Sequence, residues 1–195
     1  MFNKLIEYFL KFPGIGPRQA KRFAYFLASQ DEKFIKDLSG EISDIKNKIK
    51  QCPDCFRFFS RSDLGGKRSD LCSICSGLNR DKNILMLVEK DVDLESIERA
   101  GIYNGKYFVL GGVMPLTGDK NNLRFKELFD KAKNYKEIIL ALSANVEGEN
   151  TARYIEKILE PLKVKITHLG RGLSTGAELE YSDSETIKNA LEGRK

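Results

Sequence analysis

Apolar positions in the first fifty residues recur at helical spacing, with one short interruption rich in glycine and proline. The pattern runs over residues 2–10 and stops before Pro13, since a residue that precedes proline is driven out of the helical region. It resumes at Pro17 and returns a third time between Glu32 and Lys50. We predict three helices. The second has Ala20, Phe23, Ala24 and Leu27 on its apolar side, and the third packs within the N-terminal part through Phe34, Ile35, Leu38, Ile42, Ile45 and Ile49.

From Asn83 onward the pattern changes to short apolar runs that alternate with helical stretches. The runs predict strands, and the stretches between them predict helices. The expected strands span 84–88, 107–110, 137–142 and 164–167, and the expected helices span 91–100, 125–132 and 149–162. Strands that alternate with helices at this spacing predict an α/β domain with a mainly parallel sheet.

All four cysteines lie between these two parts, in the pairs Cys52-Pro53-Asp54-Cys55 and Cys72-Ser73-Ile74-Cys75. Two Cys-x-x-Cys pairs at this separation are typical of a four-thiolate zinc site. Two disulfides, a redox dithiol and unrelated core cysteines are the alternatives, but a redox motif needs only one pair. The spacing therefore favours structural zinc.

The stretch that follows the first pair alternates aromatic and basic residues, Phe56-Arg57-Phe58-Phe59. This composition suits contact with a nucleic acid. It suits equally a role in which the three phenylalanines cover the metal, and the sequence does not separate the two interpretations.

The interruption between the first two helices reads Pro13-Gly14-Ile15-Gly16-Pro17, and Arg18, Lys21 and Arg22 follow it on one helical face. Glycines allow the sharp turn of a helix-hairpin-helix motif. Free N–H groups at the start of the second helix, with the arginines beside them, would bind the phosphates of DNA. The alternative is a plain helical turn whose basic face is merely solvated.

The distribution of charge agrees with a nucleic-acid ligand for the front of the chain. The 195 residues carry a net charge of +5. Residues 1–50 hold 10 Lys and Arg against 6 Asp and Glu, residues 51–82 hold 6 against 4, and residues 83–195 hold 17 against 18. No apolar run is long enough to span a bilayer, and the early charge at Lys4 argues against a signal peptide. Grouped thiols fit a reducing cytoplasm.

Three carboxylates fall where the predicted strands end. Glu89 closes the first strand, and Glu147 and Glu149 follow the third. The carboxyl ends of parallel strands are where ligands bind in such sheets, so these groups could hold Mg²⁺. Alternatively, they cap a helix and face water. His168 is the only histidine, and no nucleophile elbow or P-loop occurs.

Taken together, these elements resemble the bacterial RecR family of recombination mediators over nearly the whole chain. The resemblance rests on four stretches: Phe12 to Arg22, the four-cysteine finger with Arg80 after it, Val109-Leu110-Gly111-Gly112 with Val146 to Ala152, and Gly176 to Asp183. The loop between the cysteine pairs is longer than the family usually has, the segment Val113 to Gly118 looks abbreviated, and Ser174 stands where proline is common.

The resemblance implies an α+β protein in four parts. These are a helical helix-hairpin-helix region (1–51), a four-cysteine zinc finger (52–80), a Toprim-like α/β domain (81–173) and a C-terminal tail or helix (174–195). It also implies a cytoplasmic, nucleoid-associated protein without catalytic activity. Such a protein assembles as a dimer or ring-shaped tetramer, binds single- and double-stranded DNA, and works with RecO and RecF to load RecA.

Arg18 and Arg22 match the family's basic hairpin positions, with Lys21, Gly14 and Gly16 as the supporting residues. The finger would then hold the DNA-binding end in a fixed relation to the Toprim-like end. Catalytic Toprim domains carry a Glu and a later Asp-x-Asp, where this chain has Glu147-Gly148-Glu149. A metal-dependent Toprim-class nuclease or topoisomerase-like enzyme is the alternative, and a zinc-held scaffold that does not touch DNA is a third hypothesis.

Overall fold

The computed structural model describes residues 2–64, 69–115 and 123–194, apart from the side chains of Arg61 and Leu64. Two compact units divide the chain, residues 1–50 and residues 51–195. Leu116, Thr117 and Gly118, which belong to the segment expected to be abbreviated, lie outside the described residues.

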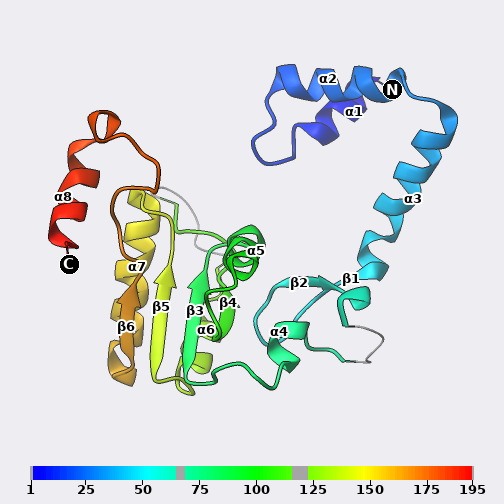
Figure 1. The fold of residues 1–195 in the computed structure, drawn as a ribbon. Helices are drawn as coiled ribbons and strands as arrows, with labels where there is room; N and C mark the ends of the chain where they lie inside the picture. The colour runs from blue at the N-terminus through cyan, green and yellow to red at the C-terminus, as the bar shows by residue number, and fades with distance from the viewer. Residues whose placement is uncertain (1, 65–68, 116–122, 195) are drawn as a thin grey trace. The chain divides into compact units, whose positions relative to one another are not determined.

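The first unit consists of the three predicted helices, drawn in blue in Figure 1: α1 (Phe2–Phe9), α2 (Pro17–Ala28) and α3 (Glu32–Lys48). Helices α1 and α2 form a hairpin. Ala20 and Ala24 are fully buried, and their small side chains allow the helices to approach closely. Aromatic pairs join the two helices, with ring centroids 5.0 Å apart for Phe2 and Tyr25 and 5.6 Å apart for Phe9 and Phe23.

Helix α3 packs within the N-terminal part through the ring of Phe34, whose centroid lies 5.9 Å from that of Phe26 of α2, but the rest of its predicted apolar face is not covered there. No residue of α3 is buried. Its apolar face stays 37–62% exposed through Phe34, Ile35, Leu38, Ile42 and Ile45. Phe23, on the predicted apolar side of α2, is 43% exposed. The helical periodicity is present as predicted, but periodicity alone does not say which surface covers an apolar face.

The second unit is built on a four-stranded sheet with the order β4-β3-β5-β6, in which every neighbouring pair is parallel. The strands are β3 (Ile84–Val88), β4 (Lys106–Val109), β5 (Glu137–Ala141) and β6 (Lys165–His168) (Figure 1). This confirms the predicted parallel sheet. The central strand β3 has β4 on one side and β5 on the other, so its carboxyl end lies at the topological switch point.

Each face of this sheet has its own core. Leu85, Leu87 and Phe108 pack with the buried side chains of α6 (Phe125–Ala132) and α7 (Val146–Leu159). Met86, Val88 and Tyr107 point to the opposite face, as successive residues of a strand must. That face is covered by Leu94 of α5 (Asp91–Ala100) and by the cysteine-containing segment.

Short elements complete the second unit. The cysteine-containing segment includes β2 (Phe58–Ser60), the 3-10 turn η1 (Arg61–Leu64) and α4 (Ser73–Ser76). Strand β2 pairs with β1 (Ile49–Gln51), so the third predicted helix ends at Lys48 rather than Lys50. Beyond α7 lie η2 (Glu160–Leu162), η3 (Leu179–Tyr181) and the tail helix α8 (Ser184–Glu192).

Helix α7 begins three residues earlier than predicted, because Asn145 caps it. The Asn145 side chain accepts a hydrogen bond of 2.8 Å from the Gly148 amide. The tight entry into this helix leaves no room for a side chain at position 148. A Cβ there would lie 2.0 Å from the carbonyl oxygen of Ser143. Glu147 and Glu149 are therefore in the first helical turn, where carboxylates favour the helix dipole.

Replacing Gly148 with alanine should destabilise the second unit, because the new methyl group would collide with backbone that cannot move freely. We expect a loss of about 1–3 kcal/mol, the usual range for overpacking. Thermal unfolding followed by calorimetry measures it. Gly170→Ala is the matched control, since nothing lies within 4 Å of a Cβ at that position. Its effect should stay within about 0.5 kcal/mol, and equal effects of the two variants would contradict the packing argument.

Candidate metal centre and nucleic-acid interface

The hairpin between α1 and α2 has the backbone that its glycines predict. Gly14 adopts a left-handed φ of 75°, which disfavours any residue with a side chain. The Ile15 amide donates to the Phe12 carbonyl at 3.2 Å and closes the turn. Gly16 is the N-cap of α2, with Pro17 in the first helical turn. The hairpin thus leads directly into a helix N-terminus whose first N–H groups have no partner within the helix.

Arg18, Lys21 and Arg22 project from α2 into solvent, and all three are exposed. Within the part of the chain that the structure describes, no hydrogen bond or ion pair engages their side chains. Helix α2 contains no acidic residue. The three charges therefore remain available to an anion that approaches the helix N-terminus.

Each cysteine pair lies in a turn closed by a backbone hydrogen bond. The Phe56 amide donates to the Cys52 carbonyl at 2.9 Å, and the Ser76 amide donates to the Cys72 carbonyl at 2.9 Å. Phe56 takes a left-handed φ of 64°, a costly conformation for a residue with a side chain. The two turns place all four sulfur atoms on facing sides.

The four Sγ atoms lie within 4.8 Å of one another, and they form the only such group of potential metal ligands in the described part of the chain. Cys55 and Cys72 have their sulfurs 3.6 Å apart. Four thiolates at ~2.3 Å from a tetrahedral Zn²⁺ have their sulfurs about 3.8 Å apart. The donor set therefore fits a thiophilic metal ion without rearrangement, and it is a candidate metal centre.

The packed thiols perturb one another's pKa values. The hydrogen bond from Cys55 lowers the pKa of Cys52, and the same bond raises the pKa of Cys55. The pKa of Cys72 is lowered to about 7, because the hydrogen bond with Cys52, which raises it, is outweighed by those with Cys55 and Cys75. The hydrogen bond with Cys52 is the main cause of a raised pKa at Cys75. Two of the four sulfurs thus favour the thiolate form that binds metals.

The phenylalanines after the first cysteine pair could either contact a nucleic acid or cover the metal site, and the structure separates them. Phe59 is 3% exposed and packs in the core with the cysteines. Phe56 is half-buried, with its ring 5.3 Å from that of Phe108 and the Arg124 guanidinium 5.1 Å above it. Phe58 is 54% exposed. Two of the three rings cover the cysteine cluster or the sheet beneath it, and only Phe58 faces solvent.

The finger is attached to the α/β domain by polar contacts that the sequence did not predict. The Lys106 ammonium, buried beneath α4, donates to the carbonyls of Ile74, Cys75 and Gly77 at 2.8, 3.0 and 3.3 Å. In the turn of the first cysteine pair, the Lys131 ammonium of α6 pairs with the Asp54 carboxylate and donates to the Asp54 backbone carbonyl at 2.7 Å. The only sign of these contacts in the sequence is Lys106, a charged residue at the start of a buried strand.

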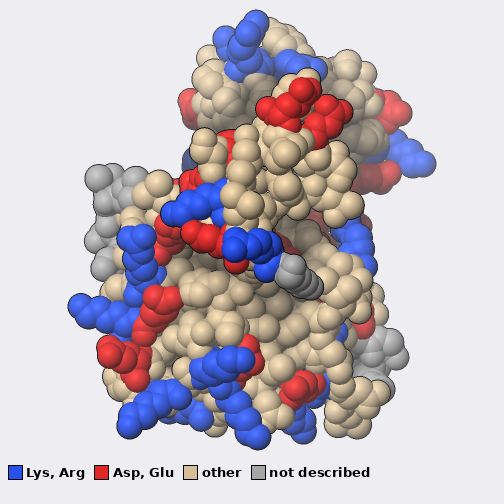
Figure 2. Space-filling model, turned by 60° about the vertical axis from the view of Figure 1, so that its left-hand side comes forward, with Lys and Arg blue, Asp and Glu red and all other residues tan. Residues whose placement is uncertain are grey.

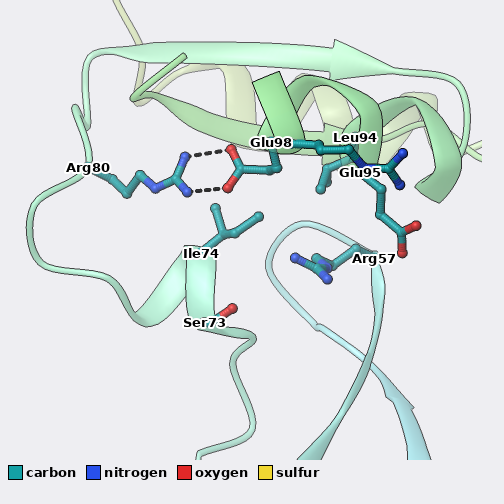
Figure 3. Close-up of a pocket in the computed structure, with 8 residues that line it drawn as sticks. Arg57, Ser73, Ile74, Arg80, Leu94, Glu95 and Glu98 are labelled. Carbon is teal, nitrogen blue, oxygen red and sulfur yellow. Dashed lines mark hydrogen bonds and ion pairs between the residues drawn. The ribbon is translucent and has the colours of Figure 1, made fainter. Parts of the chain in front are cut away.

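Arg80 joins the finger to α5 through a bidentate pair with Glu98, drawn in Figure 3. Glu98 also accepts a hydrogen bond of 2.8 Å from Tyr107. Burial tends to raise the pKa of Glu98, but the hydrogen bonds from Arg80 and Tyr107 outweigh it, and the pKa is lowered. Burial raises the pKa of Tyr107. At physiological pH the two charges of the ion pair therefore persist and cancel each other.

The three candidate carboxylates do not form a group of converging metal ligands. Glu89 is 6% exposed, and its side chain accepts a hydrogen bond from the Ser143 amide, which ties β3 to the loop after β5. Glu149 accepts one of 2.6 Å from Arg171, which lowers its pKa. Glu147 is half-buried, and no hydrogen bond or ion pair engages its side chain among the described residues.

The face drawn in Figure 2 has no broad patch of a single charge. The side chains of Lys and Arg are intermixed there with those of Asp and Glu. On this face, any preference for an anionic ligand must therefore come from individual basic residues that lack acidic partners. No helix in the described part of the chain has the length and apolar character needed to cross a bilayer.

Comparison with known families matches most of the chain in three parts. Residues 2–46 match the family model for the RecR helix-hairpin-helix, residues 83–170 match that for the Toprim domain, and residues 172–195 match that for the RecR C-terminal region.

Curated relatives match over almost their full length. The chain is 40% identical to Recombination protein RecR of Dehalococcoides mccartyi over 197 residues, which cover 99% of this chain and 93% of that protein. It is 38% identical to the protein of the same name from Lactobacillus helveticus, with coverage of 97% and 94%. For that of Chloroherpeton thalassium, the identity is 39% and the coverage 97% and 94%. With a helix-hairpin-helix, a four-cysteine cluster and a parallel Toprim sheet in this order, the chain belongs to the RecR family.

Proposed function

We propose that this protein is a DNA-binding mediator of recombinational repair, which acts with RecO and RecF to load RecA onto single-stranded DNA. The observation that carries the proposal is the arrangement of Arg18, Lys21 and Arg22 beside the N-terminus of α2. All three are exposed and have no hydrogen-bond or ion-pair partner among the described residues, and the helix carries no acidic residue to compete with a phosphate. The relatives named Recombination protein RecR support the repair role. Its place of action is the nucleoid, in the cytoplasm.

The proposed binding mode is contact with the DNA backbone. Guanidinium groups and helix N–H groups are donors that fit phosphate oxygens, and such contacts carry no sequence information. Gly14 and Gly16 shape the hairpin so that the start of α2 is accessible, and Lys21 adds a third charge. Binding to single- and double-stranded DNA would then depend little on sequence and strongly on salt.

We propose zinc as the metal of Cys52, Cys55, Cys72 and Cys75, with a structural role. Four thiolates leave no open coordination position, which is typical of structural rather than catalytic zinc. The finger is too short to fold by hydrophobic burial alone, and metal binding supplies folding free energy in such segments. The four-part division at residues 51/52, 80/81 and 173/174 remains our description of the functional regions.

Self-association is the third element of the proposal. A single hairpin offers few phosphate contacts, so that a dimer or tetramer would strengthen binding by presenting several hairpins at once. The exposed apolar stripe of α3 (Phe34, Ile35, Leu38, Ile42 and Ile45) is a surface of the kind that associating proteins bury. We propose that copies of this chain associate through it.

Replacing Arg18 and Arg22 together with alanine should weaken DNA binding, because two guanidinium groups that neutralise phosphates are removed. The slope of log K against log salt should fall by about 0.9 for each phosphate of duplex DNA that is no longer neutralised. Fluorescence anisotropy over a salt series measures both quantities. The variant should keep its helical content, since both side chains are exposed. Unchanged affinity and slope would favour the scaffold that does not touch DNA.

Replacing Cys52 with serine, or removing the metal with a chelator, should primarily destabilise the fold of the second unit. Cys52 is fully buried in the core cluster that includes Met86 and Tyr107. Zinc content should drop and the unfolding temperature should fall, with DNA binding reduced only in proportion to the folded protein that disappears. Light scattering on the same samples reports the oligomer. A variant that stays folded but no longer binds DNA would contradict the structural role.

The proposed role involves no catalysis by this chain. Labelled single- and double-stranded DNA incubated with pure protein and Mg²⁺ or Mn²⁺ should remain intact. The carboxylates that could hold a catalytic metal, Glu89, Glu147 and Glu149, do not converge. Metal-dependent cleavage that disappears in Glu89→Gln would instead identify a Toprim-class nuclease or topoisomerase-like enzyme.

A further inference from the structure

A hollow of about 380 Å³ lies between the finger and α5, and arginines from both sides line it. Figure 3 shows Arg57 and α4 on the finger side and the carboxylates of Glu95 and Glu98 on the α5 side. Arg80, Arg99, Ser73, Ile74 and Leu94 complete the lining. Both walls belong to the second unit, so the hollow is independent of where the hairpin lies.

The charges in this hollow are not equally available. Arg80 is occupied by its bidentate pair with Glu98, whose side chain is 24% exposed and also accepts from Tyr107. The charges of Arg80 and Glu98 cancel, and the two paired side chains form one fixed side of the hollow. Three charges remain on the rim, from Arg57, Arg99 and Glu95.

The two remaining arginines have few protein partners, although Arg57 lies close enough to Glu98 for its charge to help lower the pKa of that carboxylate. The only hydrogen bond of the Arg57 side chain among the described residues runs from Nε to the Phe58 carbonyl, at a long 3.4 Å, so its terminal nitrogens keep their donors. Arg99 is exposed, and no hydrogen bond or ion pair engages it within the same part of the chain. Counting every charged residue of the lining, three guanidinium groups face the two carboxylates of Glu95 and Glu98, so the hollow keeps a net positive charge.

The elements that carry these arginines are held in place. The Phe58 amide donates to the Asp91 carboxylate at 2.7 Å, which fixes the chain beside Arg57 to the start of α5. On the other side, Lys106 and Arg80 fix α4 and the segment after it to the sheet and to α5. Donors on fixed elements lose little conformational freedom when a ligand binds.

We propose that Arg57 and Arg99 form a second phosphate-binding site, at the junction of finger and α5, which takes a backbone phosphate of the DNA bound by the hairpin. The proposal rests on the DNA-binding function proposed above. Phosphate is the ligand that fits, because its oxygens match the planar fork of a guanidinium. A DNA strand is favoured as the source, since a single hairpin makes few contacts and a further site on the second unit would add to them.

Replacing Glu95 tests the proposal in the opposite direction, because a gain in DNA affinity is not expected from damage to the fold. The exposed carboxylate of Glu95 lies on the same rim and repels a phosphate. Replacing Glu95 with glutamine should therefore tighten DNA binding severalfold, whereas Arg57→Gln with Arg99→Gln should weaken it. The two changes alter the same hollow with opposite expected effects.

The test measures DNA affinity of the zinc-loaded full chain over a salt series. For Arg57→Gln with Arg99→Gln, the salt slope should fall by about 0.9 for each duplex phosphate that is no longer neutralised. Arg153→Gln with Lys157→Gln is the control, which removes two exposed charges from α7, one of them (Arg153) ion-paired with Glu149 at 3.6 Å. Zinc content and unfolding temperature must match the parent protein. Equal effects of the two double variants, or weaker binding by Glu95→Gln, would overturn the proposal.

Arginine-specific glyoxal labelling, read by peptide mass spectrometry, locates the ligand directly. DNA should protect Arg57 and Arg99 but not Arg153. Protection of Arg18 and Arg22 alone would overturn this site and leave the proposed function intact, whereas protection of none of the four would overturn both. Further arms use inorganic phosphate and thymidine monophosphate. Protection of Arg57 and Arg99 by these and not by DNA would mean that the site takes free phosphates, against our proposal.

Discussion

The packing of the four-cysteine finger against one face of the parallel sheet is the contact on which the second unit depends. Cys52, Cys55 and Cys72 belong to the same buried cluster as Met86 and Tyr107. The finger is therefore a layer of the domain as well as a candidate metal-binding segment. Without it, one face of the sheet would expose apolar side chains. A metal that holds the finger together thereby also protects the core of the α/β domain.

The arginines of this protein fall into two groups, those with partners in the fold and those free to contact a ligand. Arg80 is bound to Glu98, and Arg124 lies over Phe56 while donating to the Val109 carbonyl. These side chains hold parts of the fold together. Arg18 and Arg22 have no such partners among the described residues and lie beside a helix N-terminus. Only the second kind can exchange water for a phosphate without breaking an existing interaction.

The carboxyl edge of the sheet shows how one fold can serve different purposes. Glu89 lies at the switch point of the strand order, where ligands bind in many α/β proteins, yet its side chain ties two strands together through the Ser143 amide. Glu149 is engaged by Arg171. The fold alone does not assign a reaction to these groups, and the contacts of Glu89 and Glu149 in this chain favour a structural role.

Local pattern in the sequence was enough to predict the main helices and strands and the candidate metal ligands. The spacing of the cysteines, the glycine hairpin before Arg18 and the apolar runs from Ile84 each follow from short-range chemistry, and the structure contains all of them. The start of α7 was missed because a capping side chain, Asn145, decided it.

Tertiary structure alone decided which surfaces meet. It left the stripe of α3 exposed, buried Lys106 under the finger, and paired Arg80 with Glu98. In the described part of the chain it left Arg99 without a partner and Arg57 with a single long hydrogen bond. The reason is physical: burial and pairing depend on residues distant in the chain, which periodicity and spacing do not describe.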